Sequence, residues 1–213
     1  MLDLTRPFAS ENDYPWQLET REVPLKSQNT AYTGVIHELR CSSMCGTYID
    51  FPGHILESAD GVDAASCPAE RFWRLPAAVA RLDRTGCPGG VTAEELSAAF
   101  GASAVPVAEA SCLVVNALGP TDVWNRPDVR GVWLEMDAVE WIVASGCRLL
   151  VSDIYESNRL DGVFKRLFSA GVSTVCYPMG LHRLPVAPIA VSVLFPRVPG
   201  MVQIPCRLIA EEL

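Results

Sequence analysis

The sequence has no apolar run that approaches the roughly 20 residues of a membrane span, and its first residues do not form the basic-then-apolar pattern of a signal peptide. Basic residues are in the minority, since 17 lysines and arginines stand against 25 acidic residues and the formal net charge is -8. A nucleic-acid surface needs clustered basic side chains. We therefore expect a cytoplasmic protein that has neither a membrane nor a nucleic acid as its partner.

Internal repeats, low-complexity tracts and a clear linker are also missing. The composition is 49% hydrophobic and 20% charged, which is typical of a compact globular chain. A chain of this size buries roughly 70% of the surface that it exposes when unfolded. We expect one domain over residues 1–213.

Cysteine is plentiful, but its spacing does not indicate a disulfide framework or a zinc cluster. The eight cysteines are widely spaced, and the closest pair, Cys41 and Cys45, has no second pair at the spacing of a zinc site. We interpret most of these cysteines as small buried apolar residues.

The order of apolar stretches predicts an α/β fold with a mixed β-sheet core and flanking helices. Buried strands are predicted at 111–116, 147–152 and 172–177, and helices at 134–145 and 162–170 connect them. Strands joined through helices pair in parallel. Further strands are predicted at 2–8, 18–26, 32–41, 75–82, 189–195 and 203–210, and a capping box of Thr92 and Glu95 opens a helix that ends near Phe100.

Residues that carry chemistry are concentrated in one stretch, Met44-Cys45-Gly46-Thr47-Tyr48-Ile49-Asp50-Phe51-Pro52-Gly53-His54. Gly46 has no Cβ, so the backbone can approach a ligand closely there. A proline–glycine pair redirects the chain just before His54. Asp50 and His54 can then face one pocket, with the carboxylate orienting the imidazole as in an acid–base pair.

This stretch resembles the motif His-x-Gly-Thr-His-x-Asp-x-Pro-x-His of the Putative cyclase family, which includes bacterial kynurenine formamidase and isatin hydrolase. The matching residues are Gly46, Thr47, Asp50, Pro52 and His54. The resemblance extends from Leu2 to the end of the chain. It implies the mixed β-sheet and helix fold of that family and a homo-oligomer, either a dimer or a tetramer.

The resemblance also implies a metal site that this sequence has largely lost. In the metal-dependent members, two histidines and the aspartate of the motif bind metal together with a later histidine and a glutamate. Met44 and Tyr48 stand in place of the motif histidines, and Phe164 and Cys176 align with the later two ligands, so that only Asp50 remains. We therefore expect no metal cofactor. A zinc or manganese ion in a rearranged site is the alternative, with Cys45, Asp50, His54 and Cys176 as conceivable zinc ligands.

The catalytic residues that we expect are His54, Asp50 and Tyr48. His54 corresponds to the residue that donates and accepts protons in kynurenine formamidases, and a histidine titrates near neutral pH. Tyr48 can donate a hydrogen bond to a developing oxyanion. This set suits cyclisation, dehydration or isomerisation of a small carbonyl compound better than it suits amide hydrolysis.

Further residues are expected to contact the substrate: Tyr14, Trp16, Met44, Cys45, Phe164 and Cys176. An aromatic residue near the position of Tyr14 or Trp16 contacts the substrate in kynurenine formamidases, although either one can equally be a plug on the core. Cys45 and Cys176 are candidate nucleophiles if His54 lowers the pKa of their thiols; a buried inert thiol is the alternative.

Three functions therefore stay open at this point. The first is a metal-independent enzyme that acts on a carbonyl compound. The second is a hydrolase of a cyclic amide, lactone or formamide with a rearranged metal site. The third is a non-catalytic relative whose pocket is filled by the side chains of Met44, Tyr48 and Phe164, and a cavity that reaches His54 would count against it.

Overall fold

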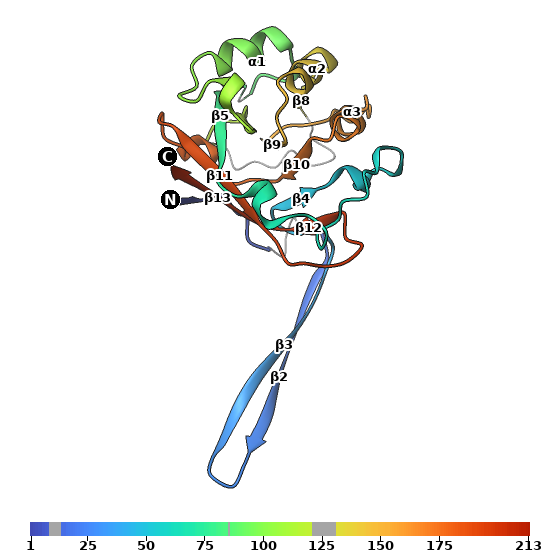
Figure 1. Ribbon diagram of the computed structural model, residues 1–213, viewed down its shortest axis with the longest axis vertical. Coiled ribbons are helices and arrows are strands. Elements are labelled where there is room, and N and C mark those ends of the chain that lie inside the picture. Colours follow the sequence, from blue (N-terminus) through green and yellow to red (C-terminus); the bar gives the residue numbers. More distant parts are fainter. Residues whose placement is uncertain (9–13, 85, 121–130) are drawn as a thin grey trace.

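Nine strands form one mixed β-sheet in the computed structural model, which describes residues 1–8, 14–84, 86–120 and 131–213 (Figure 1). Their order across the sheet is β1 (Leu2–Asp3), β13 (Arg207–Glu212), β11 (Ile189–Leu194), β5 (Leu75–Arg81), β7 (Cys112–Asn116), β9 (Leu149–Ser152), β10 (Ser173–Cys176), β4 (Tyr48–Asp50) and β12 (Gln203–Pro205). The predicted fold class, a single-domain mixed sheet with flanking helices, is confirmed.

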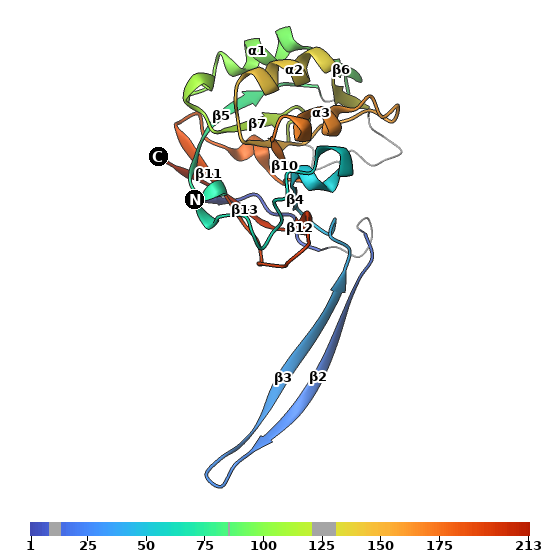
Figure 2. The same cartoon turned by 45° about the vertical axis from the view of Figure 1, so that its right-hand side comes forward.

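The centre of the sheet consists of β5, β7, β9 and β10, which run parallel to one another. Parallel pairing was predicted for β7, β9 and β10, and the structure adds β5 to them. Successive side chains of a strand point to opposite faces, so Leu113 and Val115 of β7 pack into one core, while Cys112 and Val114 pack into the other. The helices α1 (Ala93–Phe100), α2 (Met136–Ala144) and α3 (Val163–Ser169) cover the first of these faces (Figures 1 and 2).

The predicted capping box is present at the start of α1. The Glu95 backbone N–H donates to Thr92 Oγ1 (3.3 Å), and the Thr92 backbone N–H donates to Glu95 Oε2 (3.2 Å). Two backbone donors that would otherwise lack a helical partner are thereby satisfied. The helix ends at Phe100, where the sequence predicted.

The last predicted strand, 203–210, is instead two strands separated by Cys206. β12 pairs with β4, whereas β13 pairs with β11 and β1, so the two strands lie near opposite ends of the strand order. A single residue can connect them only if the sheet curls until its ends approach each other. The Cys206 backbone N–H donates to the Thr47 carbonyl oxygen (2.9 Å) at this junction. The first strand is also shorter than predicted, because its pairing with β13 ends at Asp3.

Two further sheets of two strands each lie outside the curled sheet. β2 (Trp16–Lys26) and β3 (Ala31–Cys41) form an antiparallel hairpin that extends away from the body of the molecule (Figures 1 and 2). β6 (Gly89–Val91) and β8 (Val132–Leu134) form a short parallel pair. Short 3-10 helices span Pro52–His54, Leu56–Ser58, Ala69–Phe72, Val107–Glu109 and Leu181–Arg183. Within the described part of the chain, no helix combines the length and the apolar character that crossing a bilayer requires.

Candidate active site

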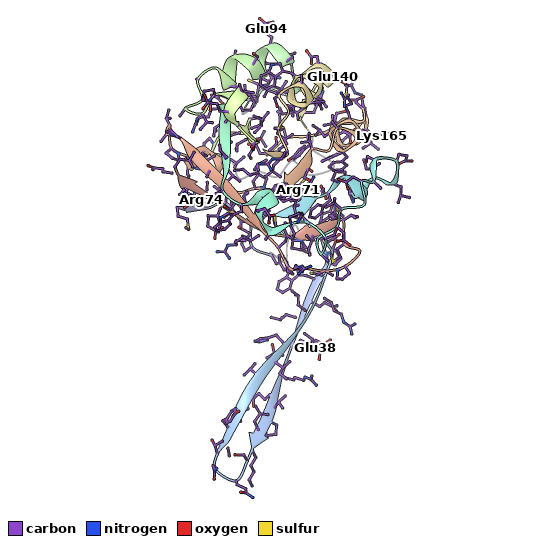
Figure 3. The ribbon with its side chains drawn as sticks, viewed as in Figure 1. Glu38, Arg71, Arg74, Glu94, Glu140 and Lys165 are labelled. Atoms are coloured by element: carbon purple, nitrogen blue, oxygen red, sulfur yellow. The ribbon has the colours of Figure 1, made fainter. Side chains whose placement is uncertain are left out.

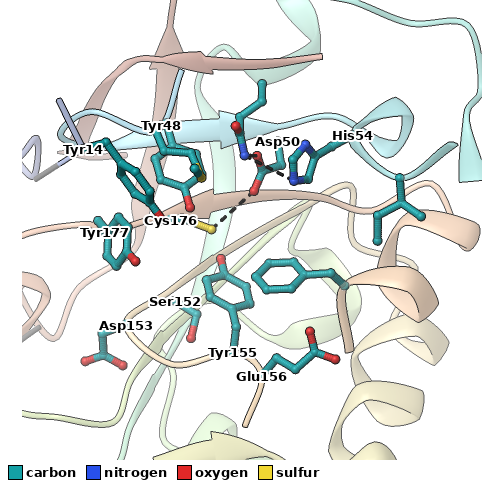
Figure 4. A pocket seen from close by; sticks show the side chains of 14 residues that line it. Tyr14, Tyr48, Asp50, His54, Ser152, Asp153, Tyr155, Glu156, Cys176 and Tyr177 are labelled. Atoms are coloured by element: carbon teal, nitrogen blue, oxygen red, sulfur yellow. Dashed lines mark hydrogen bonds between the residues drawn. The ribbon is translucent and has the colours of Figure 1, made fainter. Parts of the chain in front are cut away.

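A cavity of about 250 Å³ lies where β4, β10 and β12 meet the segment between β9 and α3 (Figure 4). Seven of the residues named in the sequence analysis line it: Tyr14, Met44, Tyr48, Asp50, His54, Phe164 and Cys176. The five positions at which the family resemblance places metal ligands are therefore brought together, although they are far apart in the sequence.

Two of the residues expected to contact the substrate are not among those that line the cavity. The thiol of Cys45 donates to the backbone carbonyl oxygen of Tyr14 (3.1 Å), and Cys45 is fully buried. The ring of Trp16 packs against that of Phe8, with 6.1 Å between the ring centroids. Both side chains thus fix the start of the hairpin, and only the neighbouring Tyr14 reaches the cavity.

Asp50 is almost completely buried, with 2% of its surface exposed. It lies on β4 between Thr174 of β10 and Gln203 of β12, its partners in register on the two neighbouring strands. Its Oδ1 accepts a hydrogen bond from Gln203 Nε2 (2.6 Å), and its Oδ2 accepts from Thr174 Oγ1 (3.3 Å) and from the Cys176 thiol (3.5 Å). Burial raises the pKa of Asp50 to about 6, even though His54 and these donors favour the charged form.

His54 lies at the mouth of the cavity, where its side chain is exposed. It ends the 3-10 helix Pro52–His54 that follows β4, so the proline–glycine bend does bring it to the same cavity as Asp50. The link between the two residues is indirect. The Gln203 side-chain Nε2 lies 3.4 Å from His54 Nε2 as well as 2.6 Å from Asp50 Oδ1 (Figure 4). The residue next to the imidazole is therefore Gln203, and not the carboxylate as the sequence predicted.

The orientation of the Gln203 amide is determined on its other side. Its Oε1 accepts a hydrogen bond from the Ser43 hydroxyl (2.7 Å), which leaves the amino group to face Asp50 and His54. An amide nitrogen is a donor only. When its hydrogen points at His54 Nε2, the neutral imidazole carries its own proton on Nδ1.

Cys176 and Tyr48 face each other on β10 and β4 and complete the inner wall. Burial, together with the charge of Asp50, raises the pKa of the Cys176 thiol well above its usual value, and the neighbouring Thr174 and Tyr48 offset this only in part. A cysteine nucleophile needs a lowered thiol pKa, so the raised pKa argues against this role for Cys176. Burial also raises the pKa of Tyr48, so its phenol stays protonated and can donate a hydrogen bond.

Gly46 and Thr47 have structural positions rather than ligand-facing ones. Gly46 has a φ of +62°, and a Cβ there would lie 2.7 Å from the backbone oxygen of Arg6. The close approach that its sequence position predicted is therefore made by the N-terminal segment and not by a ligand. Thr47 Oγ1 accepts from the Arg6 backbone N–H (2.8 Å) and donates to the carbonyl oxygen of Tyr177 (2.7 Å).

Sequence reasoning missed a second group of lining residues: Ser152, Asp153, Tyr155, Glu156, Tyr177 and Gln203. Most of them lie just beyond the carboxyl ends of the parallel strands β9 and β10, where ligands of α/β sheets commonly bind. The same rule, applied to the predicted strands at 147–152 and 172–177, would have indicated these residues from the sequence. Gln203 gives a weaker signal, as a polar residue in a stretch that otherwise reads as a buried strand.

The carboxylates of this second group are held by backbone donors. Asp153 accepts hydrogen bonds from the backbone N–H groups of Ala117 (2.9 Å) and Leu118 (3.0 Å). Glu156 Oε1 accepts from the N–H groups of Gly162 and Val163 at the start of α3. These contacts fix the segment between β9 and α3 against the sheet.

Tyr155 forms the back of the cavity. Its hydroxyl donates towards the backbone oxygens of Val175 (2.8 Å) and Leu150 (3.0 Å), and its ring stacks on Phe164 at 5.0 Å between centroids. Phe164, where the family resemblance implies a metal-binding histidine, is thereby part of an aromatic wall.

The donor set does not fit the metal centre that the family resemblance implies. Over residues 1–8, 14–84, 86–120 and 131–213, no three or more His, Cys, Asp or Glu side chains gather closely enough to hold a metal ion. Phe164 has no donor atom, and the thioether of Met44 is a soft, weak ligand. Cys45, one of the four ligands of the alternative zinc site, points to the Tyr14 backbone.

A family model described as Putative cyclase matches residues 2–158, so the chain belongs to the Putative cyclase family. A search of curated protein sequences found no match. The fold is similar to that of isatin hydrolase A from Labrenzia aggregata, with a TM-score of 0.72 and 15% identity over 98% of this chain and 92% of that one.

Two other solved structures show the same likeness. A protein described as a predicted metal-dependent hydrolase from Bacillus stearothermophilus has a TM-score of 0.68 and 15% identity, over 97% of this chain and 95% of that one. A protein described as a novel cyclase has a TM-score of 0.73 and 14% identity, over 98% and 87%. Identities this low show a shared fold, and the function must be argued from the site.

Proposed function

We propose that this chain is an enzyme that transfers protons to and from a small carbonyl compound without a metal ion, and so catalyses its cyclisation, dehydration or isomerisation. One observation carries this proposal. A buried carboxyl group with a pKa of about 6 and an exposed imidazole face the same cavity, and one amide group lies between them. Groups with pKa values near the working pH are the most effective general acids and bases.

Asp50 is the candidate base. Its pKa of about 6 leaves most of the carboxyl groups ionised at neutral pH, and that raised value makes the carboxylate a stronger proton acceptor than an exposed aspartate. Deprotonation of carbon beside a carbonyl group creates negative charge on the carbonyl oxygen. Tyr48 lines the cavity, and its protonated phenol would donate a hydrogen bond to that oxygen.

His54 is the candidate that exchanges protons with solvent. It lies at the mouth of the cavity, and an imidazole ring can both donate and accept a proton. In a dehydration it would protonate the leaving hydroxyl group, and in an isomerisation it would return the proton at a second position. Gln203 would hold the carboxylate and the imidazole in one geometry throughout.

The cavity itself favours catalysis over a purely structural role. Met44, Tyr48 and Phe164 line the space without filling it, and about 250 Å³ remains open as far as His54. A pseudoenzyme whose pocket had been filled by these larger side chains would not retain such a space. The volume lies just below the roughly 300–1,000 Å³ of typical small-molecule sites, so the substrate in this proposal is a small one.

A hydrolase is the second candidate, because the similar folds include an isatin hydrolase and a protein described as a metal-dependent hydrolase. Such an enzyme would open a cyclic amide, lactone or formamide at the same cavity. Its metal would need donors other than those that the described residues bring together.

The experiment that tests the first proposal follows proton exchange directly. The protein is incubated in D₂O with a panel of small cyclic and acyclic ketones, and NMR follows the loss of hydrogen next to the carbonyl group. We expect exchange with at least one compound, unchanged by chelator and abolished in His54→Ala and Asp50→Asn. His182→Ala, which removes an exposed histidine outside the cavity, is the control. Exchange that requires added zinc or manganese would support the hydrolase instead.

A further inference from the structure

The cavity is lined by three carboxyl groups, which belong to Asp50, Asp153 and Glu156. Asp50 lies on β4, whereas Asp153 and Glu156 belong to the segment between β9 and α3, which is here called the acidic wall. Figure 4 shows the acidic wall across the cavity from Asp50 and His54. Among the lining residues that the structure describes, none is a lysine or an arginine, and only His54 can become positively charged.

We infer that the substrate carries a protonated amino group, which the acidic wall recognises while Asp50 and His54 act on the carbonyl group of the same molecule. The inference rests on the proposed function and deepens it, because it names the charge of the substrate in the same cavity. It makes Asp153 and Glu156 specificity-determining residues, a role separate from the proton transfer that Asp50 and His54 perform.

The carboxyl group of Asp153 is held by neutral donors. It accepts hydrogen bonds from the backbone N–H groups of Ala117 (2.9 Å) and Leu118 (3.0 Å) and from the side-chain amide of Asn116 (2.9 Å). Burial raises the pKa of Asp153, although these donors favour the charged form. A positive charge in the cavity would stabilise the ionised carboxyl group further, because it supplies the opposite charge that amide donors lack.

The charges of the cavity also discriminate against anions. Glu156 is only 8% exposed and Asp50 only 2%, so water screens their charges weakly. A substrate with a carboxylate or phosphate group would bring a further negative charge into a space of about 250 Å³. Coulomb energy falls only with the inverse of distance, so an ammonium group is attracted by all three carboxylates without contacting each one. Clefts lined by charge of one sign concentrate ligands of the other sign.

The other lining residues favour an organic cation over a metal ion. Aromatic side chains form much of the remaining surface: Tyr14, Tyr48, Tyr155, Phe164 and Tyr177. The face of an aromatic ring attracts an ammonium group. The carboxylates, by contrast, do not converge on one point, since the described residues include no group of three or more metal-ligating side chains. Dispersed carboxylates among aromatic rings suit an amine better than they suit zinc or manganese.

Tyr177 is held towards the cavity by its backbone. Its φ of +54° lies in the left-handed region, which is unfavourable for a tyrosine. The hydroxyl of Thr47 donates to the Tyr177 carbonyl oxygen (2.7 Å), and the ring of Tyr48 packs edge-on against that of Tyr177 at 5.6 Å between centroids. These contacts stabilise the strained conformation and keep the ring of Tyr177 on the cavity wall.

The test compares three ketones that differ in the charge of one substituent: 4-aminocyclohexanone, 4-hydroxycyclohexanone and 4-oxocyclohexanecarboxylate. Ligand-observed NMR with the whole chain at pH 7 gives the three dissociation constants and requires no turnover. We expect the ammonium compound to bind at least about tenfold more tightly than the alcohol. The carboxylate should bind more weakly than either, and added salt should reduce the differences.

Substitutions that remove charge from the acidic wall test its role. Glu156→Gln and Asp153→Asn should each weaken binding of the ammonium compound by about threefold to tenfold and leave binding of the alcohol unchanged. A variant that merely disturbed the cavity would weaken both, so the ratio of the two affinities separates recognition from folding. Glu94→Gln, at an exposed glutamate of α1 outside the cavity (Figure 3), is the matched control and should leave the ratio unchanged.

Deuterium exchange in the same three ketones separates this inference from the proposed function. Selective binding of the ammonium compound without exchange would support the acidic wall and count against proton transfer, whereas equal exchange in all three would do the reverse. Three binding results would also overturn the inference. They are no binding of the ammonium compound in the millimolar range, binding of the alcohol or the carboxylate that is as tight, and a preference for the ammonium compound that both acidic-wall variants leave intact.

Discussion

Gln203 lies directly opposite Asp50 on the paired strands β12 and β4, and its side-chain nitrogen is 2.6 Å from Asp50 Oδ1. The same nitrogen lies 3.4 Å from His54 Nε2. Strand register thus places an amide between the two groups that the proposed function needs. Gln203 is a positioning residue in this account, because it acts on the substrate only through Asp50 and His54.

Removing this amide should change the pH dependence of activity. The Gln203 donor favours the charged form of Asp50, so in Gln203→Ala the pKa of Asp50 should rise above its present value of about 6. The acidic limb of the kcat/KM profile should move to higher pH by the same amount. Gln17→Ala, at an exposed glutamine of the hairpin formed by β2 and β3, is the matched control. An unshifted limb in Gln203→Ala would show that Gln203 does not act on Asp50.

Asp50 should make the stability of the protein fall as the pH rises. Its pKa is raised from 3.8 to about 6, so the folded state binds the proton more tightly than the unfolded state does. The stability that this proton contributes is fully present below pH 3.8 and is lost as the pH rises through about 6. A shift of about two units corresponds to about 3 kcal/mol.

The variant Asp50→Asn tests that sign. It removes a buried charge that is unfavourable at pH 7 and should therefore raise the free energy of unfolding there, by at most about 3 kcal/mol. The gain should shrink towards pH 4, where Asp50 of the wild type is already protonated. Urea unfolding at both pH values measures it, with Glu70→Gln as an exposed control. If Asp50→Asn lowered the free energy of unfolding by the same amount at pH 7 and at pH 4, this result would contradict the raised pKa of Asp50.

Cys176 should be replaceable by serine. Burial raises the pKa of its thiol, so it contributes to the site as a neutral donor to Asp50 Oδ2 and not as a thiolate. A serine hydroxyl can make the same hydrogen bond. Cys176→Ser should keep activity within about tenfold of the wild type, a modest cost of the kind that altered packing around a donor produces. A trapped covalent adduct on Cys176, or complete loss of activity in a folded Cys176→Ser, would instead identify a nucleophile.

Gly46 should be far less tolerant of alanine than another glycine with positive φ. Gly46→Ala places a Cβ 2.7 Å from the Arg6 oxygen, whereas at Gly61, with φ +80°, nothing lies within 4 Å. Both variants should lose roughly 1–2 kcal/mol of folding stability because alanine disfavours the left-handed backbone. Gly46→Ala should lose a further ~2 kcal/mol or more from the clash. If thermal unfolding showed equal losses of stability for Gly46→Ala and Gly61→Ala, the N-terminal segment would have to move aside freely.

Much of the site could be predicted from the central stretch of the sequence. A short strand followed by a proline–glycine bend determines where Asp50 and His54 lie relative to each other, and local chain geometry suffices to bring them to one cavity. The parallel strands could also be predicted from the sequence, since buried apolar runs that alternate with helices permit few other arrangements.

Two features depended on long-range pairing and could not be predicted. The contact between Gln203 and Asp50 exists only because the sheet curls and the chain breaks at Cys206 into β12 and β13, two strands with different neighbours. The strands at 18–26 and 32–41 were predicted, but their isolation was not, because an alternating pattern does not say whether a second sheet covers its apolar residues.

The proposed function requires that the site transfer protons without a metal ion, and metal content measured against activity is the sharpest test of this requirement. Protein purified with and without chelator is assayed for deuterium exchange, and zinc and manganese are quantified in the same samples. We expect activity per chain to stay constant while both metals fall far below one per chain. Activity that rises and falls in proportion to either metal would contradict it.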